Sequence, residues 1–171
     1  MDHTDSRVTT CPAPIPYYQT GQLFSVSYQN NLSAYPNNSF VFVFENPATN
    51  TKTMYLESVL GGISHSPQSN PPTLNFYLYK LESFTRTNIF TPQNLNFGSP
   101  VTSTVLVTLN PNNIRGVETP IITNHPDGEF ALYFNGKVIV PPGHNIGFEI
   151  VALQETNFRE NASINITWYE V

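Results

Sequence analysis

Hydrophobic and polar residues alternate with a period of two along most of the chain, which is the pattern of half-buried β-strands. Near the C-terminus, for example, Ile164, Ile166 and Trp168 alternate with small polar residues. The pattern predicts strands at residues 23–28, 40–45, 52–60, 74–84, 101–110, 116–122, 129–134, 137–140, 146–153 and 163–171. A helical period is nearly absent, although residues 88–95 could hold a short helix.

Turn-forming residues separate these runs. Asn135-Gly136 lies between two predicted strands, and both residues tolerate the positive φ of a two-residue type I′ hairpin, so we expect residues 129–134 and 137–140 to pair with each other. Pro-, Gly- and Asn-rich breaks separate the other strands. Many short strands with this punctuation predict an all-β fold, an antiparallel two-sheet sandwich and most plausibly a jelly roll.

The N-terminal segment differs from the rest of the chain. Residues 1–20 show no alternation, and Pro12, Pro14 and Pro16 each fix φ, so residues 11–16 should form a stiff, extended rod. We therefore divide the chain into an extended N-terminal arm, residues 1–20, and one sandwich domain, residues 21–171. A length of 171 residues suits a single domain of this kind.

The arm suggests self-assembly. An edge strand of a sandwich has unpaired backbone groups that attract another strand, and a proline-stiffened segment reaches a neighbouring subunit more easily than it turns back. Such a contact joins two different surfaces, so it propagates as a filament unless the rotation closes a ring. The candidate contact residues are Val8, Thr10, Cys11, Pro12, Pro14, Ile15, Pro16, Tyr17 and Tyr18. The bland alternative is a disordered terminus without a function.

Composition excludes several classes of protein. Charged residues make up 11% of the chain, and its net charge is −5 with cations scattered singly, so we expect no nucleic-acid partner. The longest apolar run has five residues, far below the roughly 20 that span a bilayer, so we expect no membrane partner. The first residues lack the basic and apolar regions of a secretory signal, so we expect no Sec signal peptide.

No constellation of residues indicates catalysis or a cofactor. The four histidines lack metal-ligand spacing, Asp127 and Glu129 supply too few oxygens for calcium, and no nucleophile elbow or phosphate loop occurs. We therefore expect a non-enzymatic protein without a cofactor. Tyr77 and Tyr79 share one face of a strand and are either a platform for a sugar or, more plainly, a cross-strand ladder.

Two stretches carry a resemblance to known structural proteins. Residues 140–150 read Val-Pro-Pro-Gly-His-Asn-Ile-Gly-Phe-Glu-Ile, and residues 162–171 read Ala-Ser-Ile-Asn-Ile-Thr-Trp-Tyr-Glu-Val. A Pro-Pro-Gly turn into an apolar strand, followed by a last strand ending in Trp-x-Glu, resembles jelly-roll proteins of phage virions and of Bacillus-group spore surfaces. With the arm and the charge-poor domain, the chain is most similar to a subunit of endospore appendages.

The resemblance implies a pilus-like fibre on the spore surface, in which the arm augments a sheet of the next subunit. The expected partner is a second copy of the chain, and an anchoring protein of the spore coat or exosporium could be another. Appendage subunits of the better-known kind carry paired cysteines that crosslink neighbours, whereas this chain has Cys11 alone. The alternatives are a phage virion decoration or tail protein and a carbohydrate-binding β-sandwich module.

Overall fold

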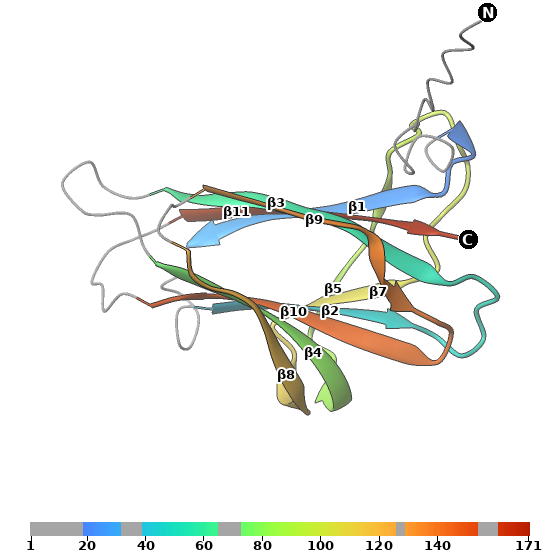
Figure 1. The fold of residues 1–171 in the computed structure, drawn as a ribbon. Coiled ribbons are helices and arrows are strands. Elements are labelled where there is room, and N and C mark those ends of the chain that lie inside the picture. The colour runs from blue at the N-terminus through green and yellow to red at the C-terminus, as the bar shows by residue number, and fades with distance from the viewer. Residues whose placement is uncertain (1–18, 32–38, 65–72, 126–128, 154–160) are drawn as a thin grey trace, which may run out of the picture.

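Two antiparallel sheets face each other in the computed structural model, which describes residues 19–31, 39–64, 73–125, 129–153 and 161–171 (Figure 1). The strands are β1 (Leu23–Asn31), β2 (Ser39–Asn46), β3 (Met54–Ser64), β4 (Leu74–Thr85), β5 (Asn88–Phe90), β6 (Gln93–Asn94), β7 (Leu106–Leu109), β8 (Asn112–His125), β9 (Glu129–Val140), β10 (His144–Ala152) and β11 (Asn161–Glu170). This arrangement confirms the prediction of an all-β, two-sheet sandwich.

The strand order is strongly non-sequential. The first sheet has the order β6-β1-β11-β3-β9, and the second has the order β5-β7-β2-β10-β4-β8. Four antiparallel pairs are nested in the chain, namely β1 with β11, β2 with β10, β3 with β9 and β4 with β8. Most contacts therefore join residues far apart in the sequence.

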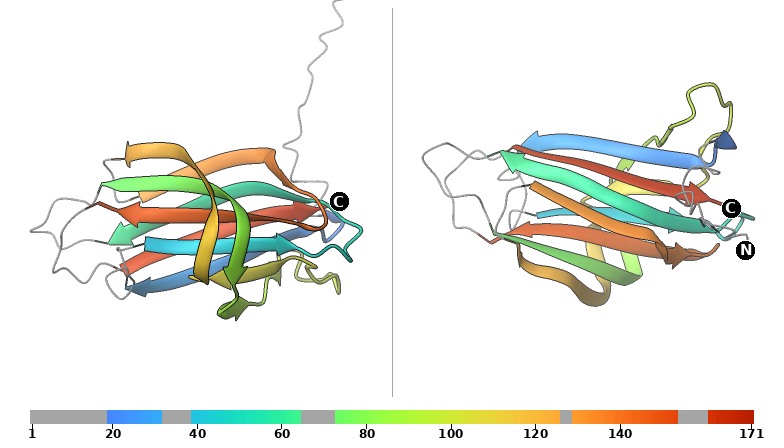
Figure 2. Two further views of the ribbon diagram at one scale, coloured as in Figure 1. Left: turned by 90° about the horizontal axis from the view of Figure 1, so that it is seen from below. Right: turned by 45° about the horizontal axis from the view of Figure 1, so that its top comes forward.

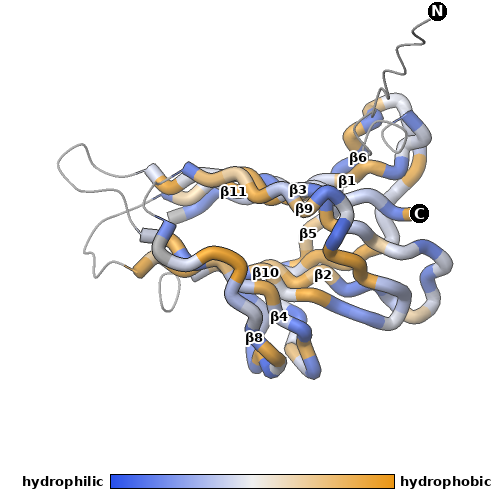
Figure 3. Tube along the Cα trace, viewed as in Figure 1, coloured by the Kyte–Doolittle hydropathy of each residue, from blue (hydrophilic) through white to orange (hydrophobic). Residues whose placement is uncertain are grey.

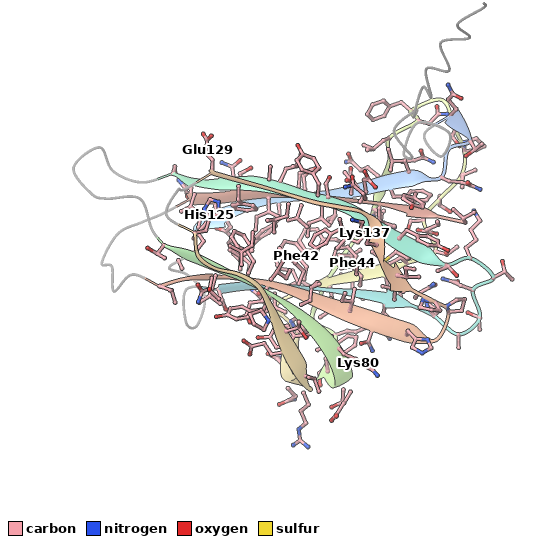
Figure 4. All side chains as sticks on the ribbon, in the orientation of Figure 1. Phe42, Phe44, Lys80, His125, Glu129 and Lys137 are labelled. Atoms are coloured by element: carbon pink, nitrogen blue, oxygen red, sulfur yellow. The ribbon has the colours of Figure 1, made fainter. Side chains whose placement is uncertain are left out.

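The core lies between the two sheets and is built from the alternating apolar positions (Figure 3). Phe42 and Phe44 of β2 point into this space (Figure 4), and both are at most 1% exposed. The Trp168 ring of β11 meets the Phe44 ring edge to face, with 5.4 Å between the ring centroids. Burial of each such side chain contributes roughly 1.5–3 kcal/mol, so the aromatic centre dominates the stability of the sandwich.

The expected hairpin at Asn135-Gly136 is wrong. Both residues have positive φ, 51° and 68°, as a type I′ turn would require, yet the segments on either side continue along β3 as one strand, β9. Leu56 pairs with Val138 and Ser58 with Tyr133, so four residues of β9 bulge out opposite one residue of β3. Asn135 and Gly136 adopt the backbone conformation that their residue types favour, but pairing with β3 outweighs local pairing across the turn.

Two other local predictions also fail. Residues 88–95 form the short strands β5 and β6 in different sheets instead of a helix. Strand structure in the predicted segment 101–110 is confined to β7, and residues 101–105 form a loop. In that loop Ser103 and Thr104 donate hydrogen bonds to the buried carboxylate of Glu170. These polar side chains therefore bind a carboxylate and do not form the outer face of a strand.

β4 and β8 form one end of the second sheet. This two-stranded β4–β8 ribbon curls over and crosses the outer side of β2 and β10 (Figure 2). Its pairing is interrupted by register shifts at four points, which bend the ribbon. Leu81 and Ile114 of this ribbon pack on Val41 and Val43 of β2, forming a second, smaller apolar cluster. The second sheet is therefore partly covered on its outer side.

Asparagine side chains hold several loops by replacing backbone partners. The Asn46 amide donates to the carbonyl oxygens of Lys52 and Val140, each at 2.9 Å. The Asn94 amide donates to the carbonyl oxygens of Gly21 and Val101, at 2.8 and 2.7 Å. Asparagine thus has a structural use in this chain, because these amides supply hydrogen bonds to backbone carbonyl groups near the loops.

Candidate functional site

The nine arm residues singled out in the sequence lie outside the described residues, as does the whole segment 1–18: Val8, Thr10, Cys11, Pro12, Pro14, Ile15, Pro16, Tyr17 and Tyr18. The structure describes the chain from Gln19 onward. Their role therefore stays a prediction. The candidate site among the described residues consists of residues 19–22, the root of this segment, and of the sheet edges.

The root is fixed at the end of the sandwich where β1 begins and β11 ends (Figure 1). The Gln22 carbonyl accepts a hydrogen bond from the Glu170 backbone N–H at 3.0 Å. The Gly21 carbonyl accepts one from the Asn94 side chain, and the Gln19 carbonyl accepts one from the Asn96 side chain at 3.3 Å. These bonds fix residues 19–22 at this end of the domain.

Two long edge strands carry features that discourage pairing. β9 has its four-residue bulge. β8 has register shifts, two charged residues, Arg115 and Glu118, and one proline, Pro120. Bulges, charges and proline on an edge all disfavour the addition of another strand. Neither strand offers the regular edge that strand addition needs.

β1 is a more regular edge. It pairs with β11 over nine residues without a register shift, and its sequence contains no proline and no charge. On its other side β6 pairs with Phe24 and Ser25, and this pairing ends at Gln93. Among the described residues, no strand continues along β1 from there toward Asn31.

The direction of the β1 backbone groups follows from two hydrogen bonds. The Leu23 carbonyl accepts from the Leu95 N–H on the β6 side, and the Gln22 carbonyl accepts from the Glu170 N–H on the β11 side. Because antiparallel backbone groups alternate sides, the N–H and C=O groups of Ser27 and Gln29 face the β6 side. Among the described residues no strand pairs with these groups, which leaves this edge as a candidate for another strand.

The motifs that carried the resemblance have structural roles. Pro141-Pro-Gly-His144 closes a turn in which the His144 N–H donates to the Pro141 carbonyl at 3.1 Å and Gly143 has φ of 79°, as in a type II turn. Glu170, 1% exposed, accepts four hydrogen bonds from Trp168, Ser103 and Thr104. The Trp-x-Glu ending thereby ties the last strand to the loop before β7.

Tyr79 contacts side chains of both neighbouring strands, as expected of a cross-strand ladder, and Glu118 is its direct register partner on β8. Tyr77 accepts a hydrogen bond from the Asn75 amide at 2.7 Å. Tyr79 donates to the carboxylates of Glu149 and Glu118, and its contact with Glu149 is short. Desolvation and these two carboxylates raise the pKa of the Tyr79 hydroxyl well above its usual range, so it stays a hydrogen-bond donor.

Two histidines, His125 and His144, lie in the described residues. The His125 ring meets the Phe76 ring edge to face at 5.9 Å, and His144 Nδ1 bonds to the Pro142 carbonyl at 3.0 Å. In the part of the chain that the structure describes, no three His, Cys, Asp or Glu side chains gather as a metal ion would require. That part also holds no helix long and apolar enough to cross a membrane.

A search against models of protein families found no match, and neither did a search of curated proteins.

Sequence reasoning missed the two surfaces that the fold creates. The open edge at Ser27 and Gln29 follows from the end of β6, and a charged groove that contains Arg86 and Glu45 follows from the curl of the β4–β8 ribbon. Pro92, directly before β6, is the nearest local signal for the first surface, because proline is confined to the edges and ends of strands. The second surface has no local signal, since Arg86 and Glu45 are 41 residues apart.

Proposed function

We propose that this chain is a non-enzymatic structural subunit that assembles head to tail into a non-covalent fibre. Residues 1–18 of one subunit add as a strand to β1 of the next. The observation that carries the proposal is the position of the root at one end of the sandwich, together with an open, regular edge that extends along β1 toward the other end.

We also infer that the sandwich is a jelly roll. Support comes from the nested strand pairs and from their distribution, with β1-β11-β3-β9 in one sheet and β2-β10-β4-β8 in the other. A long antiparallel ribbon rolled into two sheets gives this order, and jelly rolls have eight such strands. β5, β6 and β7 are then additions in the long connection between β4 and β8.

The edge chemistry favours β1 as the acceptor. The backbone groups of Ser27 and Gln29 face the open side, while bulges, charge or proline protect β8 and β9. An added strand would lie beyond the end of β6 and pair with up to six residues, since the part of β1 beyond β6 runs from Val26 to Asn31. At roughly 3.3 Å per residue this part is about 20 Å long. Residues 8–10 and 15–18 are the candidate donors.

The length of the segment suits a contact between subunits. Eighteen residues precede Gln19, and at 3.3–3.6 Å per residue they reach at most about 60 Å. The nine residues of β1 span about 30 Å at the usual rise, so the segment can pass along one sandwich and reach a neighbour. Because donor and acceptor are different surfaces, the contact repeats from subunit to subunit and produces a fibre unless the rotation closes a ring.

The stabilisation of each joint comes from two sources. Backbone hydrogen bonds to β1 fix the register, and burial of Val8, Ile15, Tyr17 and Tyr18 contributes roughly 1.5–3 kcal/mol for each side chain that becomes fully buried. A fibre built in this way does not depend on a disulfide, in keeping with the single cysteine of the chain.

Electron microscopy of the purified protein tests the proposal. The full chain should form thin fibres, and a chain that begins at Tyr17 should stay monomeric. Mixing the two should shorten the fibres, because the truncated subunit accepts an arm and cannot donate one. Discrete particles from both chains, or fibres from the truncated chain, would show that the proposal is wrong.

A backbone variant separates the acceptor edge from the rest of the domain. Ser27→Pro removes the N–H that faces the added strand and should abolish fibres, while Ser27→Ala keeps the N–H and should assemble normally. Both variants lose the hydroxyl that accepts a bond from the Asn165 amide at 2.7 Å, so the pair is matched. Thermal unfolding shows that each variant is folded, and fibres from a folded Ser27→Pro variant would exclude β1 as the acceptor.

The resemblance to endospore appendages motivates the proposed location, the spore surface. Immunogold labelling of intact endospores with an antibody against the domain tests it, and label confined to the cytoplasm would contradict it. The main rival is a virion decoration or tail protein. Sedimentation of the full chain as a closed trimer, with or without residues 1–16, would favour that rival.

A further inference from the structure

A groove opens where the β4–β8 ribbon crosses the outer side of the second sheet. Its volume is about 630 Å³, within the usual range of ligand-binding pockets. One side is formed by the end of β4 and the residues after it, from Glu82 to Arg86. The other side is formed by the end of β2 and the start of β10, with Gly143 and His144 at the turn between β9 and β10.

Charge is concentrated in this groove. Charged residues make up 11% of the chain, yet three of the twelve residues that line the groove are charged, Glu45, Glu82 and Arg86, and His144 is a fourth titratable group. The alternating sheet positions do not explain this gathering, because Arg86 comes from the segment that connects β4 with β5. The groove therefore offers a polar ligand more charged side chains than an average stretch of this surface does.

The side chains of the groove are held in place before any ligand arrives. The Arg86 guanidinium and the Glu45 carboxylate meet through two parallel hydrogen bonds, one of 3.0 Å from Nε and a shorter one from the terminal nitrogen. A paired guanidinium of this kind is planar and keeps further N–H groups for a ligand. The pair also cancels its own net charge, so it suits an uncharged polar ligand better than an ion.

Hydrogen-bond acceptors face the same groove. The Pro142 carbonyl can only accept, so His144 Nδ1 carries the proton in this contact, and in the tautomer that this leaves, Nε2 is an acceptor. The Glu82 carboxylate is exposed at the opposite side. Asn145 Oδ1 is buried with no hydrogen-bond partner among the described residues, and a rotation of this amide would let it accept from a ligand.

An apolar surface lies beside these polar groups. Phe84 is half-buried, lines the groove and packs on the cluster of Val41, Val43 and Leu81. Its ring is thereby fixed in orientation, with Pro47 and Ala48 across the groove. An aromatic ring next to planar polar side chains matches one class of ligand well, because a sugar ring has an apolar C–H face and a rim of hydroxyls.

We propose that this groove binds a neutral oligosaccharide. Each sugar hydroxyl both donates and accepts, so a vicinal pair can donate to Glu82 or His144 and accept from Arg86, while the C–H face packs on Phe84. An extended peptide fits less well, because its backbone would need an open strand edge and this groove is walled by side chains and turns. The binding is independent of fibre formation, since no groove residue lies on β1 or before it.

Saturation-transfer NMR of the full chain tests the proposal with a panel of uncharged tri- to pentasaccharides, linked β-1,4 from glucose, N-acetylglucosamine, mannose or galactose. At least one member should show saturation transfer at its C–H protons and bind with a Kd in the millimolar range or below. If no member of the panel binds, or if short uncharged peptides bind instead, the proposal is wrong.

Substitutions locate the site. Arg86→Ala and Glu82→Gln should each weaken binding of the same saccharide about tenfold. Glu82→Gln keeps the shape of an exposed side chain, so a loss of affinity in this variant would not come from misfolding. Arg115→Ala changes an exposed arginine on β8 outside the groove and should leave the affinity unchanged. Equal affinity for the native protein and the Glu82→Gln and Arg86→Ala variants would place the binding elsewhere and overturn the proposal.

Discussion

The carboxylate of Glu170 offers the sharpest test of how this sandwich is held together. Its side chain is 1% exposed. One carboxylate oxygen, Oε1, accepts from Ser103 Oγ at 2.5 Å and from the Trp168 indole N–H at 3.0 Å. The other, Oε2, accepts from the Thr104 backbone N–H at 3.1 Å and from its hydroxyl at 2.7 Å.

Replacing Glu170 with Gln keeps the shape of the side chain and exchanges one acceptor for an NH₂ group. The hydroxyls of Ser103 and Thr104 can rotate and accept from that group. The N–H groups of Trp168 and Thr104 cannot, so in either orientation of the amide one fixed donor faces another donor. A buried donor left without an acceptor costs about 1–3 kcal/mol.

We therefore expect Glu170→Gln to lower the free energy of unfolding by about 1–3 kcal/mol and Glu170→Ala to lower it further. For a chain of this size, each kcal/mol lowers the melting temperature by about 2–4 °C. Urea unfolding followed by fluorescence measures the change directly, because Trp168 is the single tryptophan and lies in the network.

Glu129→Gln is the matched control, since Glu129 is exposed on β9 (Figure 4) and should change the free energy of unfolding by less than about 0.5 kcal/mol. The reasoning would be refuted by a Glu170→Gln variant that is as stable as the control, with an unchanged dependence on urea. That result would mean that the loop before β7 shifts and re-forms its bonds at no cost.

Two further predictions concern the bulge of β9. Gly136 has φ of 68°, and a Cβ there would overlap the Tyr169 hydroxyl, so Gly136→Ala should lower the free energy of unfolding by about 1–3 kcal/mol in the same urea assay. Gly98→Ala is the control and should change it little, because a Cβ there would meet only Asn96 Oδ1 at an ordinary contact distance of 3.6 Å. Desolvation raises the pKa of Glu57, which sits opposite the bulge, so the folded state binds more protons than the unfolded state just above pH 4.5. Stability should then fall as pH rises through this range, and Glu57→Gln should stabilise the protein at pH 7 but not below pH 4; a Glu57→Gln variant that is less stable at pH 7 would contradict this assignment.

The strands could be predicted from the local pattern of the sequence, whereas the pairing between them depends on tertiary contacts. The alternation of Ile164, Ile166 and Trp168 predicted β11 because a strand with one buried face must alternate, whatever its partner is. Asn135-Gly136 shows where this reasoning stops. The two residues adopt the positive φ that their types favour, but the choice between a hairpin and a bulge depends on β3, which is about 75 residues earlier in the chain.

The candidate sites follow the same division. Turn types and strand faces are local properties, so the Pro-Pro-Gly turn and the exposed side of β1 could be predicted from short stretches. The pairing of Arg86 with Glu45 and the open edge at Ser27 depend on how the ribbon and β6 pack, which no window of sequence contains. Asn46 illustrates the same limit, because its amide donates to the Val140 carbonyl 94 residues away.

The curl of the β4–β8 ribbon makes the two outer faces of the sandwich different from each other. The second sheet is partly covered by this ribbon, whereas small uncharged side chains such as Ser163, Asn165 and Thr167 occupy the outer face of the first sheet. A subunit with two unlike faces cannot be turned over within an ordered assembly without bringing different surfaces into contact. In a fibre of equivalent subunits every subunit therefore presents its two faces in the same orientation to the fibre axis.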